Sequence, residues 1–143
     1  MQRTLLTASA DETATVGWRL ARGLVVGDVV AVAGELGSGK TTLIRGACRA
    51  LGVAGTVSSP TYTIGHRYEA SVPVAHLDLY RVGPVGVEDW GDLEPYFDGT
   101  IAFVEWPEHA AGRLQPVRAT VWMEHVDESH RRITIASEDD LRL

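Results

Sequence analysis

The chain has 143 residues, of which 45% are hydrophobic and 22% charged, and 13 basic against 19 acidic residues give a net charge of −6. These values are typical of a mildly acidic globular protein, so they exclude a disordered or fibrous chain, and the length predicts one domain over residues 1–143. The acidic balance also argues against broad binding to a nucleic-acid backbone. The longest apolar stretch, 24–33, is interrupted by Asp28 and falls far short of the roughly 20 residues that cross a membrane. We expect neither a membrane span nor a secretion signal, because Leu5–Leu6 is no hydrophobic region and Asp11–Glu12 follow at once. The lone Cys48 allows no disulfide within the chain, which fits the expected cytoplasmic location.

Hydrophobic periodicity and turn residues predict an α/β domain. Ser9 and Glu12 have the spacing of a capping box before the first helix, and Gly34 ends the first strongly apolar strand. In chain order, the predicted elements are a helix over 10–22, a strand over 29–33, a helix over 41–51, two extended segments over 61–68 and 72–79 that could form a hairpin, short helical pieces within 84–98, a buried strand over 100–104, a short helix toward Leu114, and an antiparallel hairpin of 119–126 and 131–136. Helices mixed with buried and alternating strands predict a mixed β-sheet flanked by helices, with an antiparallel C-terminal hairpin.

Residues 34–41, Gly-Glu-Leu-Gly-Ser-Gly-Lys-Thr, match the phosphate-loop pattern G-x-x-x-x-G-K-[ST] and lie between a predicted strand and a predicted helix. Glycines let such a loop curl so that its N–H groups point at a polyphosphate, and the following helix adds the positive end of its dipole. Lys40 then reaches the terminal phosphates, Thr41 supplies a hydroxyl to Mg²⁺, and Thr42 can offer another to a phosphate oxygen. The predicted phosphate-binding residues are Leu36, Gly37, Ser38, Gly39, Lys40, Thr41 and Thr42.

Lys40 is also the only lysine, beside 12 arginines. A chain that is depleted in lysine keeps it where a compact ammonium group on a flexible stem is needed, which arginine does not provide. Codon usage in a GC-rich genome is the alternative explanation of this bias.

Two carboxylates, Asp78 and Glu105, end apolar strand-like runs. A carboxylate at this place points from the C-terminal edge of a sheet, where it can hold Mg²⁺ directly or through water. We therefore expect both residues at the catalytic site, and Glu105 follows the better apolar run. The alternative for each is an ordinary solvated acid at the end of a strand.

Several other side chains have two interpretations. Thr61 and Thr63 could contact the γ-phosphate or position water, as switch segments do, or they are plain strand threonines. Trp106 is an aromatic platform, a partner contact or partly buried core. His76 with Asp78 has the spacing of half a metal site, but no third ligand follows at a telling distance. The remaining candidates are arginines: Arg131 and Arg132 are expected on a solvated hairpin face, and Arg81 either neutralises transition-state charge or forms a structural ion pair.

These motifs, taken in order, resemble those of the TsaE family, the bacterial ATPases of tRNA threonylcarbamoyladenosine synthesis. The resemblance rests on four segments that cover nearly the full chain, namely the phosphate loop continued to Thr42, Ser59-Pro-Thr-Tyr-Thr63, His76-Leu-Asp-Leu-Tyr-Arg81 and Glu105-Trp-Pro-Glu108. A phosphate loop alone is shared by hundreds of families, whereas the last two segments are far more specific. Tyr62 departs from the pattern because the family often has Phe there.

The resemblance implies a mixed sheet with helices on both faces and Mg²⁺ held by Thr41 and Glu105. It also implies that Asp78 lies close to the metal and phosphates and that Thr61 belongs to a switch-like loop, so that Lys40, Asp78, Glu105 and Thr61 form the catalytic set. The family's adenine pocket involves the N-terminal segment, which corresponds here to the region from Ser9 to Thr13.

The function that the resemblance implies is ATP hydrolysis with Mg²⁺ in support of repeated turnover by TsaD and TsaB, which transfer threonylcarbamoyl to adenosine 37 of tRNA. The acidic charge agrees with a protein that meets tRNA only indirectly, through its protein partners. A guanine-specific N-K-x-D motif is impossible because the only lysine lies in the phosphate loop, which favours ATP. Two alternatives stay open, a small-molecule kinase that uses the same loop and a nucleotide-binding regulatory module without useful hydrolysis.

Overall fold

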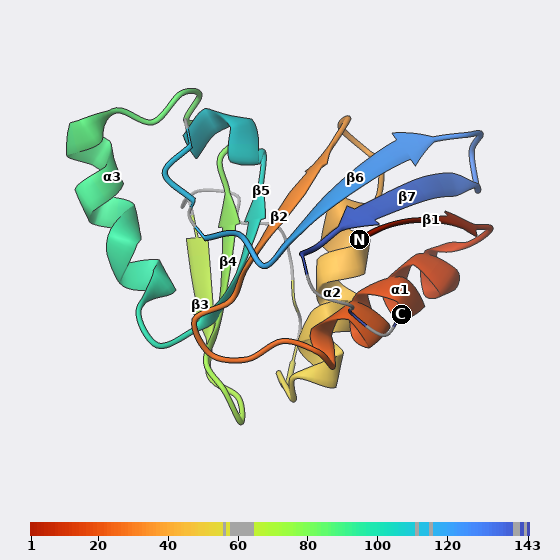
Figure 1. The fold of residues 1–143 in the computed structure, drawn as a ribbon, viewed down its shortest axis with the longest axis horizontal. Helices are drawn as coiled ribbons and strands as arrows, with labels where there is room; N and C mark the ends of the chain where they lie inside the picture. Colours follow the sequence, from red (N-terminus) through yellow and green to blue (C-terminus); the bar gives the residue numbers. More distant parts are fainter. Residues whose placement is uncertain (56, 58–64, 111, 115, 139–140, 142) are drawn as a thin grey trace.

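In a computed structural model of the chain, the described residues form one mixed sheet of seven strands with helices on both faces (Figure 1). The structure describes all residues except 56, 58–64, 111, 115, 139–140 and 142. The elements are β1 (Gln2–Thr7), α1 (Ala10–Ala21), β2 (Val29–Gly34), α2 (Lys40–Ala50), β3 (Gly65–Tyr68), β4 (Val74–Asp78), α3 (Val87–Leu93), the 3₁₀ helix η1 (Glu94–Phe97), β5 (Ile101–Glu105), the 3₁₀ helix η2 (Pro107–Ala110), β6 (Ala119–His125) and β7 (Arg131–Ala136).

The strands are arranged in the order β1-β7-β6-β2-β5-β4-β3. Strand β2 pairs in parallel with both β5 and β6, and β4 pairs in parallel with β5. The pairs β1–β7, β6–β7 and β3–β4 are antiparallel. The predicted mixed sheet, the C-terminal hairpin and the β3–β4 hairpin are therefore confirmed.

The parallel strands at the centre of the sheet bring residues that are far apart in the sequence to the C-terminal edge of the sheet. Strands β2, β4 and β5 run in the same direction, so their C-terminal ends lie together. Asp78 is in register with Glu105, and Glu105 is in register with Val32 of β2, two residues before Gly34. The phosphate loop and both strand-end carboxylates consequently leave the sheet at the same place.

The structure differs from the predicted elements at three places. Strand β1 was not predicted, because Gln2–Thr7 lies at the edge of the sheet with mostly exposed residues and so lacks a clear apolar pattern. The helix expected to reach Leu114 is limited to the single 3₁₀ turn η2. The first part of the extended segment over 61–68 lies outside the described residues, and the strand begins at Gly65.

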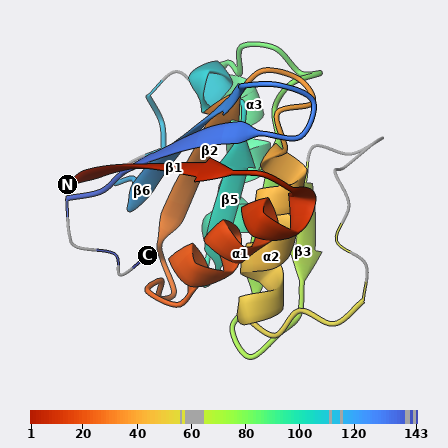
Figure 2. The same ribbon diagram turned by 90° about the vertical axis from the view of Figure 1, so that its right-hand side faces the viewer.

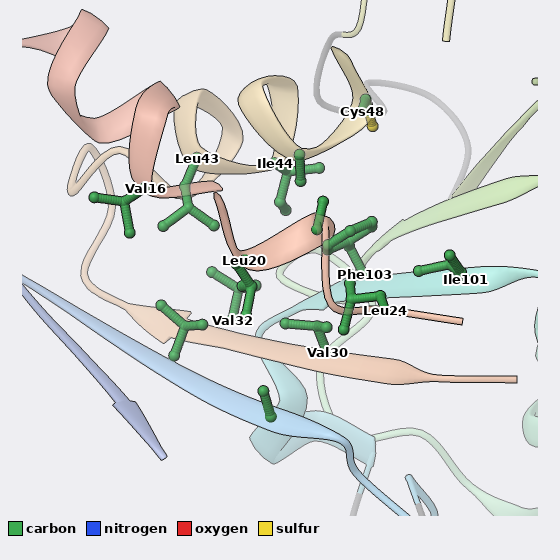
Figure 3. Close-up of a cluster of buried hydrophobic side chains, with 14 of the residues drawn as sticks. Val16, Leu20, Leu24, Val30, Val32, Leu43, Ile44, Cys48, Ile101 and Phe103 are labelled. Carbon is green, nitrogen blue, oxygen red and sulfur yellow. The ribbon is translucent and has the colours of Figure 1, made fainter. Parts of the chain in front are cut away.

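The two faces of the sheet carry separate hydrophobic clusters. Helices α1 and α2 lie side by side on one face (Figures 1 and 2), where Leu20, Leu43 and Ile44 pack against side chains of β2 and β5 (Figure 3). Helix α3, with η1 and η2, packs on the other face around Leu77, Leu93 and Val104. The helices expected on both faces are thus confirmed. Within the described part of the chain, no helix combines the length and apolar character needed to span a membrane.

Candidate functional site

The phosphate loop joins β2 to α2, and its glycines have the backbone geometry that the loop requires. Gly39 caps the start of α2 in the left-handed region, with φ 101°, which strains any residue that has a Cβ atom. A Cβ atom on Gly34 would lie 2.5 Å from the backbone oxygen of Met123. Only glycine fits these two positions, so the loop can curl at the edge of the sheet and direct the N-terminus of α2 toward a ligand.

Lys40 is the first residue of α2, and its ammonium group folds back over the loop. Nζ donates hydrogen bonds to the backbone oxygens of Gly34 at 2.6 Å and Glu35 at 2.9 Å, and it lies 4.6 Å from the centre of the Trp106 ring. Burial lowers the pKa of Lys40, while nearby carboxylates, Glu105 first among them, oppose the shift. A phosphate oxygen can replace these carbonyl acceptors, so the ammonium is already held at the mouth of the loop.

Trp106 follows β5 and is the only described non-glycine residue with a positive φ, at 59°. Its half-buried ring lies 4.8 Å from the ring of Tyr80 and 6.0 Å from that of His109, centre to centre. The strained backbone turns the ring toward the phosphate loop, where it lines the same cavity as Lys40. Trp106 is therefore an aromatic wall of this cavity, and its partly buried side chain also packs against the hydrophobic cluster on the α3 face.

Glu105 is almost completely buried, with 3% exposure, and its carboxylate joins three elements. Oε2 accepts a hydrogen bond from His76 Nε2 of β4 at 2.6 Å and one from the Thr41 hydroxyl of α2 at 3.4 Å. Asp78, beside it in register, accepts a hydrogen bond from the backbone N–H of Tyr80 at 3.0 Å. The end of β4, the end of β5 and the start of α2 thus meet around two carboxylates and one hydroxyl.

This donor set fits Mg²⁺, which prefers hard oxygen ligands and keeps several waters in its coordination shell. Thr41 and Glu105 already contact each other through oxygen atoms, and Asp78 lines the same cavity. The half zinc site considered for His76 and Asp78 takes a different form, because His76 is bonded to Glu105. No group of three or more His, Cys, Asp and Glu placed to hold a metal occurs among the residues that the structure describes.

Two neighbouring cavities surround the phosphate loop. The first, of about 330 Å³, is lined by Leu36, Gly37, Gly39, Lys40, Thr41, Thr42, Asp78, Tyr80, Glu105 and Trp106. The second, of about 340 Å³, is lined by Ser9, Ala10, Thr13, Gly37, Gly39, Thr42, Glu128, Ser129 and Arg131. Gly37, Gly39 and Thr42 line both cavities, so a ligand that extends along the loop can occupy the two together.

The N-terminal segment forms one wall of the second cavity. The Ser9 hydroxyl accepts a hydrogen bond from Glu12 N at 3.1 Å and so caps α1, while Glu12 accepts one from Ala8 N at 3.2 Å. Thr13, one turn further along α1, is buried, and its hydroxyl lies 2.8 Å from that of Thr7. These bonds fix the start of α1 beside the phosphate loop.

The opposite wall comes from the C-terminal hairpin, and here the sequence-based expectation for Arg131 was wrong. Arg131 was expected on a solvated face, but its Nε donates to Ser38 O at 3.2 Å and its Nη2 to Gly37 O at 3.5 Å. Arg132 is exposed, as expected, and pairs with Glu124 at 3.3 Å. Alternation along the strand cannot identify such a contact, because Arg131 and Ser38 are 93 residues apart in the sequence.

The turn that carries Glu128 and Ser129 into this wall is organised by Asp127. Its carboxylate accepts hydrogen bonds from the backbone N–H groups of Ser129 at 3.0 Å and His130 at 2.8 Å. The side chain and backbone of His130, together with Ser129 N–H, lower the pKa of Asp127 to about 2. The carboxylate stays ionised at neutral pH and keeps the turn closed beside the cavity.

The structure brings most of the predicted site residues together. Those around the first cavity are Leu36, Gly37, Gly39, Lys40, Thr41, Thr42, Asp78 and Glu105, and Ser9 and Thr13 line the second. Ser38 lines neither cavity, because its side chain is fully buried and only its backbone oxygen faces Arg131. Thr61 and Thr63 lie outside the described residues, so their suggested role stays a prediction. The residues that sequence reasoning missed are Tyr80 and the hairpin residues Glu128, Ser129 and Arg131.

Comparisons with known proteins agree on one family. The profile of the family described as "Threonylcarbamoyl adenosine biosynthesis protein TsaE" matches residues 7–133. The chain is 42% identical to the tRNA threonylcarbamoyladenosine biosynthesis protein TsaE of Synechocystis over 106 residues, which are 68% of this chain and 67% of the relative. It is 34% identical to the TsaE protein of Bacillus subtilis over 133 residues, 92% of this chain and 83% of the relative. The crystal structure of Bacillus subtilis YdiB superposes with a TM-score of 0.79 and 26% identity, covering 97% of this chain and 87% of that one.

Proposed function

The chain belongs to the TsaE family, with that family's role in tRNA threonylcarbamoyladenosine biosynthesis, and from this premise we propose that it is a Mg²⁺-dependent ATPase acting on a complex of TsaB and TsaD. In this proposal ATP hydrolysis resets the partner complex after each modification of adenosine 37, so that one complex can act on many tRNA molecules. The proposed location is the cytoplasm.

The observation that carries the proposal is the convergence of Lys40, Thr41 and the carboxylates Asp78 and Glu105 around one cavity. A strand, a glycine-rich loop and a helix N-terminus form a general polyphosphate site, and carboxylates beside it provide oxygen ligands for the accompanying metal. All four residues come from the C-terminal ends of parallel strands or from the helix that follows, the part of an α/β sheet where ligands bind.

Each residue has a proposed role in this site. Lys40 exchanges its two carbonyl acceptors for oxygens of the terminal phosphates and offsets charge that develops there. The hydroxyl of Thr41 and the carboxylate of Glu105 hold Mg²⁺, which neutralises phosphate charge when bound. Asp78 accepts hydrogen bonds from water around the metal, and Thr42 donates to a phosphate oxygen. Thr61 is proposed to belong to the loop that responds to the γ-phosphate.

The second cavity is the proposed site of the nucleoside. It shares Gly37, Gly39 and Thr42 with the first, so an adenosine bound against Ser9 and Thr13 would leave its phosphates along the loop. Glu128, Ser129 and Arg131 close the cavity from the hairpin. This arrangement supports the adenine position implied by the family resemblance.

One contact favours hydrolysis over transfer to a metabolite. Kinases with this loop normally close a lid that carries several arginines over the transferred phosphate. Between positions 63 and 105 the sequence contains only Arg67 and Arg81. Arg67 donates to the backbone oxygens of Pro95 at 3.5 Å and Asp98 at 3.3 Å, so it is engaged with η1. With one of its two arginines held at η1, this segment does not offer the several arginines of a kinase lid, which supports an ATPase.

The test compares the wild-type chain with Lys40→Ala and Lys40→Arg in ATP hydrolysis and in binding of a fluorescent ATP analogue, with Mg²⁺ present. We expect both variants to lose about 100-fold or more in kcat/KM, because arginine keeps the charge but not the compact donor. The exposed Arg132→Ala variant serves as a control and should keep wild-type activity. Full ATP affinity and turnover in Lys40→Ala would overturn the proposal, and labelled phosphate appearing on a metabolite faster than in water would favour a kinase.

A further inference from the structure

We propose that His76 is a positioning residue for the metal site, holding the Glu105 carboxylate so that it faces Thr41 and the metal. This inference rests on the proposed function, since it assigns a task to a residue beside the Mg²⁺ ligands. The observation behind it is the hydrogen bond from His76 Nε2 to Glu105 Oε2 at 2.6 Å, the shortest hydrogen bond between two side chains described in the site.

The sheet register explains why these two side chains meet. His76 and Asp78 lie two residues apart on β4, so both point to the face of the sheet that carries α2. Glu105 is in register with Asp78 on the adjacent parallel strand β5, which puts it diagonally next to His76. His76 is completely buried, and it occupies a position between Val74 and Asp78 where an apolar side chain would pack with the cluster beneath α2.

The chemistry of the contact sets the direction of the hydrogen bond. The carboxylate that binds a metal is ionised and only accepts hydrogen bonds, so with Glu105 in this form the 2.6 Å contact assigns a proton to Nε2 of the imidazole. Nδ1 has no hydrogen-bond partner among the described residues. The bond to Glu105 is thus the polar contact that fixes the ring within the part of the chain that the structure describes.

The hydrogen bond from His76 orients the Glu105 carboxylate for its proposed role in holding the metal. Oε2 receives two donors, His76 Nε2 and Thr41 Oγ1, from opposite elements. This leaves Oε1 of Glu105 and the lone pairs of the Thr41 hydroxyl for a cation or its waters. A Glu105 side chain without His76 could instead rotate toward the ammonium of Lys40, which lines the same cavity. His76 therefore keeps the negative charge available to the metal and Lys40 available to the phosphates.

A pair of amide variants tests this inference. In His76→Gln the side-chain NH₂ lies near the place of Nε2 and can still donate to Glu105, whereas in His76→Asn the NH₂ lies near the place of Nδ1 and cannot. The two variants bury the same polar group, so they share the cost of an amide in the core. The readouts are Mn²⁺ affinity in the presence of ADP, measured by electron paramagnetic resonance, and ADP affinity in EDTA. Thermal unfolding confirms that each variant is folded.

We expect His76→Asn to bind Mn²⁺ about 10- to 100-fold more weakly than the wild-type chain, as is usual when a partner of a metal ligand is removed. His76→Gln should recover most of that loss, and ADP affinity in EDTA should change less than about twofold in both, because the loop itself is untouched. His66→Leu is the control, since His66 lies opposite His76 on β3 but contacts Tyr68. It should bind Mn²⁺ like the wild type.

Equal Mn²⁺ affinity in all three His76 forms, with normal binding by the wild type, would overturn the inference and leave the proposed function standing. Failure of His76→Gln to recover the loss would also overturn it, because a purely structural histidine has no need of a donor at Nε2. A wild-type chain that binds ADP but no Mn²⁺ would overturn both the inference and the proposed metal-dependent activity.

Discussion

The two faces of the sheet differ in how closely their helices pack. On one face α1 and α2 cross in backbone contact, since a Cβ atom on Gly17 would lie 1.9 Å from Leu43 O and one on Gly46 only 1.8 Å from Ala14 O. On the other face the seven-residue α3 leaves open space around Gly91. A cavity of about 610 Å³ extends there beside Trp90 and Phe97, at the sheet end away from the phosphate loop.

This difference follows from what each face supports. Helix α2 begins with Lys40 and Thr41, so its position sets where the ammonium and the hydroxyl meet a phosphate or a metal. Because the close backbone contact leaves α2 little room to slide against α1, it restricts the position of the start of the helix. Nothing in the described site comes from α3 itself, and the cluster on that face meets the site through Trp106, which packs against the cluster and lines the cavity.

The largest effect is expected from matched glycine substitutions on the two faces. Gly46→Ala forces α1 and α2 apart and should lower the free energy of unfolding by about 3 kcal/mol, at the upper end for an overpacked core. Gly91→Ala, in open space on α3, should change it by less than about 1 kcal/mol and could raise it, because alanine favours a helix. Urea denaturation of both variants provides the measurement. Similar losses in the two would contradict the contrast between the faces.

A smaller effect is expected from the arginine pair on β7. Arg131→Ala removes two hydrogen bonds to phosphate-loop carbonyls and should weaken ADP binding by about tenfold, or roughly 1.4 kcal/mol. Arg132→Ala removes an exposed contact with Glu124 and should leave ADP binding within about twofold of the wild type. Calorimetric titration of ADP distinguishes the two variants. Equal affinities would mean that the hairpin does not support the loop.

The reactivity of Cys48 measures how closely α1 and α2 pack, and it can be followed in the wild-type chain without a substitution. Its thiol is fully buried on α2, and burial raises its pKa to about 12, so the thiol stays protonated at pH 8. The reactive thiolate forms only as the pH approaches this raised pKa. The reactivity of Cys48 in the folded chain should therefore stay low up to mildly alkaline pH.

We expect iodoacetamide to label Cys48 at pH 8 at least about 100-fold more slowly in the native chain than in urea, as followed by mass spectrometry. The Gly46→Ala variant, two residues away on the same helix, should label faster than the wild type. Rapid labelling of the native wild type would show that α1 and α2 separate more readily than their backbone contact implies.

The sequence predicted the parallel centre of this fold better than its edges. The composition of the valine-rich run of β2 and of the apolar runs in β4 and β5 indicates buried strands, because strands covered on both faces are mostly apolar. Strand β1 gives no such signal. Its residues Gln2–Thr7 have only one partner strand, and five of the six are not fully buried.

The site residues also divide into those that the local sequence could identify and those that it could not. The phosphate loop, Asp78 and Glu105 could be identified because each depends on local sequence, a motif or the end of an apolar run. The contacts of Arg131 with Ser38 and of His76 with Glu105 depend on strand order, which no local pattern contains. Arg131 was expected on a solvated hairpin face, because the local sequence does not show that the start of β7 lies beside the phosphate loop.

The most direct test of the proposed role is a time course of tRNA threonylcarbamoylation reconstituted with TsaD, TsaB and a supply of the threonylcarbamoyl adenylate. The wild-type chain or its Lys40→Ala variant is added with ATP and Mg²⁺, and modified tRNA is counted per partner complex. We expect modification to continue past a single equivalent only with the wild-type chain, because repeated turnover requires its ATP hydrolysis. Turnover that is unchanged by either form would contradict the account.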